Sequence, residues 1–434
     1  MKYEKKIQKI EADWILPVTS PPIKDGVIIV DGNVVKAMGI KRELSSFPCD
    51  KTIDCSNKIL MPGFINAHIH LELTGLRGRI KKGLPFVEWA REIVSIRRNI
   101  TENEIATDIK DGLDELISSG VTAVGDFSQT GITAKILNEK GLRGTVFIEF
   151  SRSFRPDMKD EIMQRLRKVA AGFSLREYAI TVTQPKGCDY QNLDNIKFGV
   201  APHAPYSVSR ELLQDSYRFA QKKRFPFAIH ISEMTEEIDF IKNGSGAMRD
   251  LLIEFGVWND SWIPPQTTPV KYLNSLGVLK KATGIHLNIV TEGDINILKE
   301  NNVSVVYCAG SNKWFGRNWK YPLKEFLNRG INVAIGTDSL SSNEKLNIFY
   351  EMRVIKENFP DLENDIILKM ATINGAKAIG FENEIGEIAV GRKADIIGID
   401  IEDSSFNNPI EYVINKAEKV SFSMVDGEII LREI

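Results

Sequence analysis

Short apolar runs alternate with amphipathic stretches through the central part of the chain. Runs of strand length stand near residues 65–70, 121–126, 144–150, 196–203, 226–232, 284–290, 303–308 and 331–337. Stretches with helical periodicity separate most of them, for example at residues 208–224, 292–301, 321–329 and 345–357. Strands and helices that alternate in this way predict an α/β fold with a parallel sheet, and eight such strands predict a (β/α)8 barrel of the TIM type.

One helix start is marked by its own side chains. Thr101 and Glu104 have the spacing of a capping box, in which each side chain accepts a hydrogen bond from the other residue's backbone N–H. The helical stretch that follows stops at Gly120, and the strand-like run 121–126 comes next. The sequence therefore predicts one clear helix-strand unit of the barrel.

Both ends of the chain have a different pattern from the middle. Residues from about 7 to 62 form short apolar runs separated by turns, and Asp31-Gly32 is a typical hairpin signal. From residue 384 onward the chain returns to short strands and glycine turns. We therefore predict a small β-sandwich domain composed of residues 1–62 and 384–434, with residues 63–383 forming the barrel.

Composition excludes several kinds of partner. The 434 residues carry a net charge of only -2 and no basic stripe, which argues against nucleic acid or an anionic membrane as the main partner. The four cysteines stand far apart with no Cys-x-x-Cys pair, so we expect reduced thiols. The N-terminus lacks an apolar signal core, and no apolar run reaches the roughly 20 residues of a membrane span. A cytoplasmic protein is expected.

Histidine is scarce, and its positions are unusual. Each of the five histidines stands at or near the end of a strand-like run: His68, His70, His203, His230 and His286. Residues two apart on a strand share a face, so the first two can bind the same ion. Asp338 directly follows the run 331–337, where a buried carboxylate needs a partner. Because chemistry in such barrels occurs at the C-terminal ends of the strands, these residues predict an active site there.

Several motifs together make the chain resemble the amidohydrolase superfamily, in its aminohydrolase branch of deaminases and chlorohydrolases. The resemblance covers nearly the full length. It rests on Pro62-Gly63-Phe64-Ile65-Asn66-Ala67-His68-Ile69-His70, Pro202-His203-Ala204-Pro205-Tyr206-Ser207, His230-Ile231-Ser232-Glu233, Ser311-Asn312, Gly336-Thr337-Asp338-Ser339 and the tail from Gly386 to Ile396. No single motif is specific, but the set is.

The resemblance implies one divalent metal ion. Its ligands would be His68, His70, His230 and Asp338. Three imidazoles and a carboxylate suit zinc or ferrous iron, and zinc is the expected ion with iron as the alternative. The third and fourth strands offer no inward lysine that could be carbamylated and bridge two ions, apart from Lys197 at the wrong end. A site with a single ion is therefore favoured.

The resemblance also implies roles in catalysis. Glu233 would shuttle protons, His286 and Asp338 would orient the attacking water, and His203 would contact the substrate ring. The chemistry is consistent with this assignment, because metal binding can lower the pKa of a water to about 7. A deaminase also needs a carboxyl group to protonate the ring nitrogen and then the leaving amine.

Candidate substrate residues follow the first strand. Glu72 comes directly after the His-x-His segment, and Trp89 lies on an amphipathic helix that ends at Arg97 and Arg98. Aminohydrolases that act on methylthioadenosine and S-adenosylhomocysteine often carry a ribose-binding Glu near the end of this helix. With two arginines in that region, the sequence looks more similar to aminofutalosine deaminases, whose substrate carries a benzoate.

Arginine is the natural partner for such a carboxylate, because its planar fork forms two hydrogen bonds to it. The candidate anchors are Arg97, Arg98, Arg152 and Arg155. The alternative for each of them is a solvated surface arginine.

We therefore predict a hydrolytic deaminase of an adenine-containing nucleoside, with aminofutalosine as first choice. Hydroxide on the metal would attack the amine-bearing ring carbon and ammonia would leave. The alternatives are a methylthioadenosine/S-adenosylhomocysteine deaminase and a guanine or s-triazine aminohydrolase or chlorohydrolase. A remote alternative is a non-catalytic scaffold of this fold, which predicts eroded ligands, whereas every expected ligand is present here. The expected partner is a small purine nucleoside or related heterocycle. The long excursion 243–271 is a candidate lid or a contact in a homo-oligomer.

Overall fold

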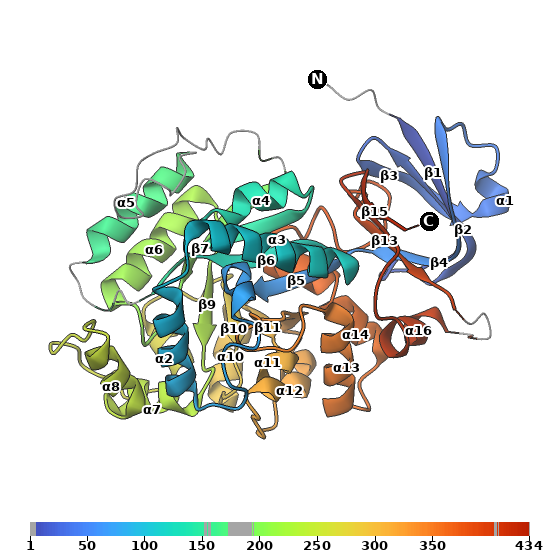
Figure 1. Cartoon of the computed structure of the whole chain (residues 1–434). Helices are drawn as coiled ribbons and strands as arrows, with labels where there is room; N and C mark the ends of the chain where they lie inside the picture. The colour runs from blue at the N-terminus through green and yellow to red at the C-terminus, as the bar shows by residue number, and fades with distance from the viewer. Residues whose placement is uncertain are drawn as a thin grey trace.

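The chain forms a large α/β body and a smaller unit of strands. The computed structural model describes residues 6–151, 154, 158–171, 193, 195–402, 406 and 408–433. Figure 1 shows the blue N-terminal strands and the red C-terminal strands side by side in the smaller unit. The candidate anchors Arg152 and Arg155 lie outside the described residues.

Eight parallel strands occupy the centre of the large body, in two four-stranded sheets. The first sheet contains β5 (Phe64–Ile69), β6 (Val121–Ser128), β7 (Arg143–Phe150) and β8 (Ile196–Pro202). The second contains β9 (Ala228–Ile231), β10 (Thr283–His286), β11 (Ser304–Tyr307) and β12 (Asn332–Ile335). Every predicted strand of the central part is therefore present, and the parallel α/β class is confirmed.

The two sheets meet at both of their edges. At one edge, the backbone N–H of His230 donates a hydrogen bond of 2.9 Å to the carbonyl oxygen of His203. At the other, the N–H of Asp338 donates to the carbonyl oxygen of His68 over 3.0 Å. The second contact requires a glycine at position 336, because a Cβ there would lie 2.8 Å from the Cβ of His68. Candidate site residues from both sheets are thus brought together.

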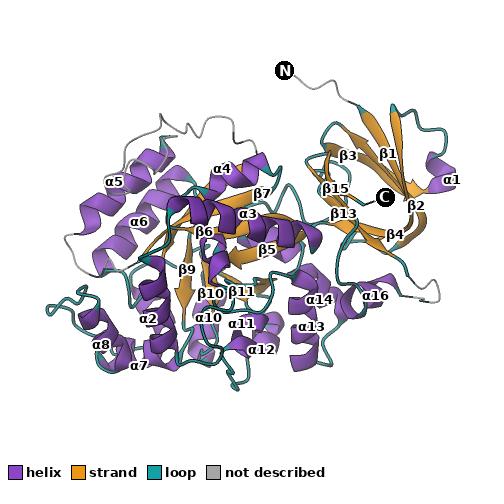
Figure 2. Ribbon diagram, in the orientation of Figure 1, coloured by secondary structure: helices purple, strands orange, loops and turns teal. Residues whose placement is uncertain are grey.

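Helices cover the outside of the two sheets (Figure 2). The four helices predicted between strands correspond to α6 (Arg210–Lys223), α10 (Glu292–Glu300), α12 (Leu323–Asn328) and α13 (Ile348–Asn358). The remaining helices of the body are η1 (Leu71–Leu76), α2 (Phe86–Arg97), α3 (Glu102–Ser118), α4 (Thr133–Glu139), α5 (Lys159–Ala170), α7 (Thr235–Asn243), α8 (Ala247–Glu254), α9 (Pro269–Ser275), α11 (Ala309–Trp314), α14 (Asn364–Met370) and α15 (Ile373–Ala378). Helix α3 begins with the predicted capping box.

One predicted strand is shorter than expected. The apolar run 284–290 predicts a strand over its whole length, but β10 ends at His286. His286 and Leu287 adopt positive φ angles of 70° and 52°, which a β-strand does not permit. The chain therefore turns at His286, at the C-terminal end of the sheet.

The smaller unit is one sheet of seven strands in the order β15-β14-β13-β4-β1-β2-β3. Its strands are β1 (Ile7–Ile15), β2 (Ile23–Asp31), β3 (Val34–Ile40), β4 (Lys51–Pro62), β13 (Ile396–Asp400), β14 (Phe422–Val425) and β15 (Glu428–Arg432); the short helices α1 (Lys41–Leu44) and α16 (Pro409–Asn415) accompany them. Antiparallel pairing of β13 with β4 joins the two ends of the chain. The chain ends therefore share one sheet as predicted, whereas the two-layer sandwich stays a prediction.

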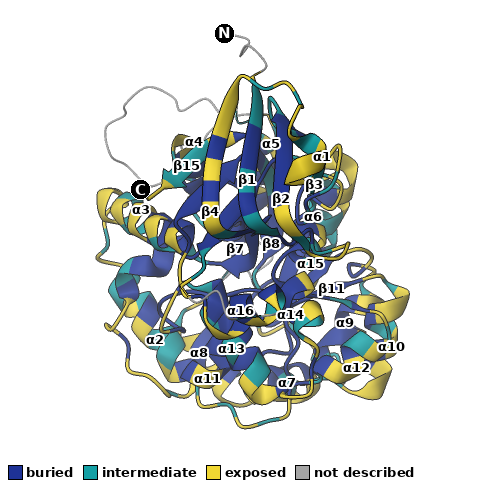
Figure 3. Ribbon diagram, turned by 90° about the vertical axis from the view of Figure 1, so that its right-hand side faces the viewer, coloured by how far each residue is buried: buried dark blue, intermediate teal, exposed yellow. Residues whose placement is uncertain are grey.

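A buried ion pair connects this sheet to the large body. Arg143, at the start of β7, donates to Asp395 over 2.8 Å and to Asp426 over 3.1 Å, and its side chain is only 1% exposed. Figure 3 shows the central strands β7 and β8 in the dark blue of buried residues and exposed positions on the outer helices. Among the residues that the structure describes, no helix combines the length and apolar character that crossing a bilayer requires.

Candidate active site

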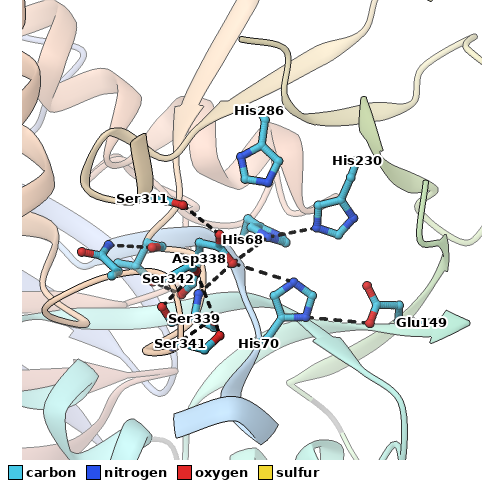
Figure 4. A network of polar contacts seen from close by, with 12 residues as sticks. His68, His70, Glu149, His230, His286, Ser311, Asp338, Ser339, Ser341 and Ser342 are labelled. Atoms are coloured by element: carbon cyan, nitrogen blue, oxygen red, sulfur yellow. Dashed lines mark hydrogen bonds and ion pairs between the residues drawn. The ribbon is translucent and has the colours of Figure 1, made fainter. Parts of the chain in front are cut away.

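The four predicted metal ligands meet at the C-terminal ends of the strands (Figure 4). His68 lies within β5 and His70 follows it, His230 comes from β9, and Asp338 follows β12. The Nε2 atoms of His68 and His230 are 3.3 Å apart. Asp338 Oδ1 lies 3.6 Å from Nε2 of His68 and 3.9 Å from Nε2 of His70. Strands from both sheets therefore contribute to one cluster.

The spacing of these donors fits a metal ion. Two nitrogens that bind one tetrahedral zinc ion at about 2.0–2.1 Å lie about 3.3 Å from each other. Nδ1 of His230 is 2.8 Å from the carbonyl oxygen of His203 and donates to it, which leaves Nε2 with its lone pair. Asp338 is also held in place, because Oδ2 accepts from Ser311 Oγ (3.0 Å) and Oδ1 from the Ser339 N–H (2.8 Å).

The protonation states suit cation binding as well. Burial lowers the pKa of His68, brings that of His230 to about 4, and holds that of His70 well below its usual range. Burial by itself raises the pKa of Asp338, but the neighbouring imidazoles of His68, His286 and His70 outweigh it and hold the pKa well below its usual value. Neutral imidazoles and an ionised carboxylate are the forms in which these groups bind a metal.

Glu233 and His286 lie next to this cluster. His286 ends β10, and its Nε2 is 3.7 Å from Oε2 of Glu233. Burial holds the pKa of His286 well below its usual value, so the imidazole is neutral at pH 7. Ser232, His286 and Asp338 all have positive φ angles, of 52°, 70° and 60°. Such strained residues concentrate at functional sites, where surrounding structure holds them.

His203 follows β8 and lines the cavity beside the cluster. Its Nδ1 lies 2.9 Å from Ser207 Oγ, so the ring is anchored through that nitrogen. Burial holds the pKa of His203 well below its usual value, again favouring a neutral ring. The ring nitrogen Nε2 is left to hydrogen-bond with a ligand.

A cavity of about 320 Å³ opens beside these residues. One wall is polar and includes His70, His203, Glu233, His286 and Asp338. An apolar wall comes from two helices, α2 with Phe86, Trp89 and Ile93, and α8 with Met248, Leu251 and Leu252. An apolar cavity with a few convergent polar groups is typical of a small-molecule site.

The predicted substrate residues occupy different places. Trp89, Arg97 and Arg98 line the cavity, and the indole N–H of Trp89 donates to the carbonyl oxygen of Ser341 over 2.7 Å. Glu72 is buried and is not among the cavity residues. Instead it accepts a hydrogen bond from Arg97 at 3.1 Å and others from Ser128 and Thr130. Glu72 thus anchors the guanidinium of Arg97, the last residue of α2.

Sequence reasoning missed several residues of the site. Glu149 near the end of β7 lines the cavity, and its Oε2 lies 3.8 Å from Nδ1 of His70. It stands at the end of a buried apolar run, the same signal that marked the histidines. The apolar wall from α8 falls within the excursion 243–271, whose Trp262 stacks on Phe240 of α7 with ring centroids 4.6 Å apart. Arg317, which contacts Glu233, had no sequence signal.

The chain is similar in sequence and in fold to known proteins. The model of the amidohydrolase family matches residues 59–430. A methylthioadenosine/S-adenosylhomocysteine deaminase of Thermoanaerobacter pseudethanolicus is 30% identical, covering 95% of this chain and 91% of its own. The structure of a zinc-bound adenosine deaminase from Xanthomonas campestris superposes with a TM-score of 0.82 at 24% identity, covering 98% of this chain and 93% of that one. Helicobacter pylori aminofutalosine deaminase bound to methylthio-coformycin gives 0.82 at 21% identity, covering 97% and 99%.

Proposed function

The chain belongs to the amidohydrolase family and is a hydrolase of carbon-nitrogen bonds, and on this basis we propose that it is a metal-dependent deaminase of adenine-containing nucleosides. One observation carries the proposal: Glu233, His286 and the cluster around Asp338 face one cavity whose other wall is apolar. A flat, mostly apolar ring with a leaving amine fits such a cavity. A scaffold without activity would not need this set of neutral imidazoles and carboxylates.

The proposed metal site holds a single divalent ion. His68, His70, His230 and Asp338 are the proposed ligands, with zinc as first choice and iron as the alternative. Donor atoms of the three histidines lie within 4.8 Å of one another, and Asp338 Oδ1 lies within 3.9 Å of two of them. Lys197 does not reach the cavity, because its Nζ binds the carbonyl oxygen of Gly380 at 2.7 Å, and no described lysine lines the cavity. When bound, the ion would supply hydroxide at neutral pH by lowering the pKa of a water to about 7.

The proposed reaction consumes one water and releases one ammonia. A carbon-oxygen bond forms at the ring carbon and the carbon-nitrogen bond breaks. Glu233 would accept one proton of the attacking water and pass it to the ring nitrogen. It would then take the second proton from the new hydroxyl group on the ring carbon and deliver it to the amine, which leaves as ammonia. His286, whose Nε2 is 3.7 Å from Glu233 Oε2, would orient the water together with Asp338. His203 would contact the ring through Nε2.

Aminofutalosine remains the first choice of substrate because of two cavity arginines. Arg97 is paired with Glu72, whereas the guanidinium of Arg98 forms no hydrogen bond or ion pair with any other described residue. An exposed guanidinium at the cavity suits a carboxylate on the far end of a substrate. Arg97, fixed by Glu72, would add to the positive charge there.

A methylthioadenosine or S-adenosylhomocysteine substrate is the second candidate. The relative from Thermoanaerobacter pseudethanolicus, at 30% identity, carries that name. Met248, Leu251 and Leu252 on α8 would also suit an apolar thioether. The guanine and s-triazine alternatives predict a smaller ligand that would leave this wall uncontacted.

Steady-state kinetics with matched arginine variants would test the substrate choice. We expect Arg98→Ala to lower kcat/KM for aminofutalosine by about 10-fold or more, the worth of a hydrogen bond to a charged group, and to leave methylthioadenosine nearly unchanged. Arg91→Ala on the same helix is the control, because Arg91 pairs with Glu254 and does not line the cavity. If the wild type deaminates methylthioadenosine or S-adenosylhomocysteine but not aminofutalosine, the second candidate substrate is the correct one.

We also propose that the eight strands close into a (β/α)8 barrel and that residues 1–62 with 384–434 form a separate domain. The hydrogen bonds at both sheet edges support the barrel. A separate apolar core supports the domain, since its buried residues come only from the chain ends: Ile10, Ile28, Ile53, Leu60, Ile396 and Phe422 are among them.

A further inference from the structure

Glu233 is paired with a buried arginine on the side away from His286. Nη2 of Arg317 donates to Oε1 of Glu233 over 2.9 Å. Both side chains are buried, with 6% of Arg317 and 7% of Glu233 exposed. A charge-assisted hydrogen bond between buried partners is stronger and better aligned than one on the surface. One carboxylate oxygen of Glu233 is therefore already occupied.

Arg317 is itself fixed from three directions. Its Nη1 donates to Oδ1 of Asn312 over 3.0 Å. Its guanidinium carbon lies 4.3 Å from the ring centre of Phe315 and 5.7 Å from that of Trp319, so the group packs between aromatic faces. Arg317 does not line the cavity. Any effect on a substrate would therefore act through Glu233.

Hydrogen bonds from Asn312 through Asn288 also reach the backbone of Glu233. Asn312 Nδ2 donates to Oδ1 of Asn288 over 2.8 Å, and Asn288 Nδ2 donates to the carbonyl oxygen of Glu233 over 3.0 Å. The N–H of Glu233 donates to Oε2 of Glu237 over 2.8 Å. With its N–H, carbonyl oxygen and Oε1 all engaged, Glu233 keeps Oε2 as its one oxygen toward His286.

We propose that Arg317 is a positioning residue, which fixes Glu233 so that Oε2 alone exchanges protons with the water and the ring. The inference rests on the proposed function, in which Glu233 moves those protons. An arginine suits this task because its fork binds Glu233 and Asn312 with two different nitrogens. A lysine would keep the positive charge, but its single ammonium nitrogen lacks the planar fork that binds Glu233 and Asn312 with two different nitrogens.

Kinetics of Arg317→Met and Arg317→Lys test the proposal. We expect Arg317→Met to lower kcat about 100-fold, the loss that a misplacement of about 1 Å causes, with KM almost unchanged and full metal content. Arg317→Lys should lie between this variant and the wild type. Guanidinium ion, added below the concentration that unfolds the protein, should restore part of the kcat of Arg317→Met by filling the vacated position.

A matched control uses Arg329→Met, because Arg329 pairs with Asn296 and Glu292 and takes no part in the hydrogen bonds around Glu233. Its kcat should equal that of the wild type. A kcat of Arg317→Met within about twofold of the wild type would overturn the positioning role. So would a loss that guanidinium does not restore and that accompanies a lower unfolding temperature, since this indicates a purely structural residue.

Failure of this inference can be distinguished from failure of the proposed function. If the wild-type, metal-loaded protein releases no ammonia from any adenine nucleoside, the proposed function fails. If the wild type does so and Arg317→Met matches it, only the role of Arg317 fails.

Discussion

The Nε2 atoms of His68 and His230 lie 3.3 Å apart although their strands, β5 and β9, belong to different sheets. Burial keeps both rings neutral, since it lowers the pKa of each. This distance is the one expected between two neutral imidazole nitrogens that bind the same metal ion. The site therefore depends on how the two sheets meet, and several measurable consequences follow from that dependence.

The metal content of variants should distinguish a proposed ligand, His230, from His203, a cavity histidine that is not a proposed ligand. His230→Ala should weaken zinc binding by at least about 100-fold, more than the loss of an outer-shell partner usually causes. His203→Ala should keep a single ion per chain, because His203 contributes a backbone carbonyl to His230 and is not a proposed ligand. Elemental analysis after dialysis measures both. Equal metal loss in the two variants would contradict the ligand assignment.

The metal-free protein should lose stability in mild acid. Burial lowers the pKa of His230 from its ordinary 6.5 to about 4, so between these pH values the unfolded state binds more protons than the folded state. Stability should be full above pH 6.5 and decline as the pH falls toward 4. The contribution of His230 is roughly 3 kcal/mol at most. Urea unfolding of chelator-treated protein at several pH values measures it.

The control for this pH dependence is His230→Gln, which cannot be protonated in this range. Its unfolding free energy should change less steeply with pH than that of the wild-type chain. Identical slopes would show that other groups cause the acid sensitivity.

Gly336→Ala should disturb the contact between the two sheets at which the Asp338 N–H bonds to the His68 carbonyl oxygen. The added Cβ would lie 2.8 Å from both the His68 Cβ and Val306 Cγ1, so the backbone has to shift. We expect a loss of about 1–3 kcal/mol in unfolding free energy and weaker metal binding. Gly39→Ala in β3 is the control, since its Cβ would meet its nearest neighbour at 3.6 Å. Undiminished metal affinity in Gly336→Ala would show that the close contact between the sheets at Gly336 does not position the metal ligands.

Arg143→Met should cost stability without affecting the site. It leaves Asp395 and Asp426 without their buried guanidinium, which costs about 3–5 kcal/mol. Arg143 starts β7, whereas the site lies at the opposite ends of the strands. Metal content and kcat of the folded variant should therefore equal those of the wild type. The double variant Arg143→Met/Asp395→Leu should recover part of the stability, and a decrease instead would contradict the ion-pair interpretation.

The sequence predicted the strands and the histidine cluster because both leave local signals. An apolar run ending in a rare, chemically distinctive residue marks His230 and His286 wherever the chain folds. The length of β10 was wrong, because left-handed backbone at His286 depends on contacts with the neighbouring strands. Arg317 was missed because its partner Glu233 is 84 residues away, and a loop arginine has no periodicity to reveal a buried contact.

Substrate residues were harder to predict for the same reason. Glu72 follows the His-x-His segment and so suggests a ligand contact, but it is buried in a hydrogen bond with Arg97 and does not line the cavity. Such pairings depend on how loops pack over the strands. The apolar wall from α8 likewise becomes visible only when the excursion is folded against α2.

The most direct measurement of the central claim is ammonia release by the metal-loaded protein from aminofutalosine, methylthioadenosine, S-adenosylhomocysteine and adenosine, beside Glu233→Gln. The account predicts one ammonia per nucleoside converted by the wild type. For Glu233→Gln it predicts a kcat about 100- to 10,000-fold lower at equal metal content, the range that proton transfer by a placed side chain contributes. Absence of ammonia from every adenine nucleoside, or full activity of Glu233→Gln, would contradict the account.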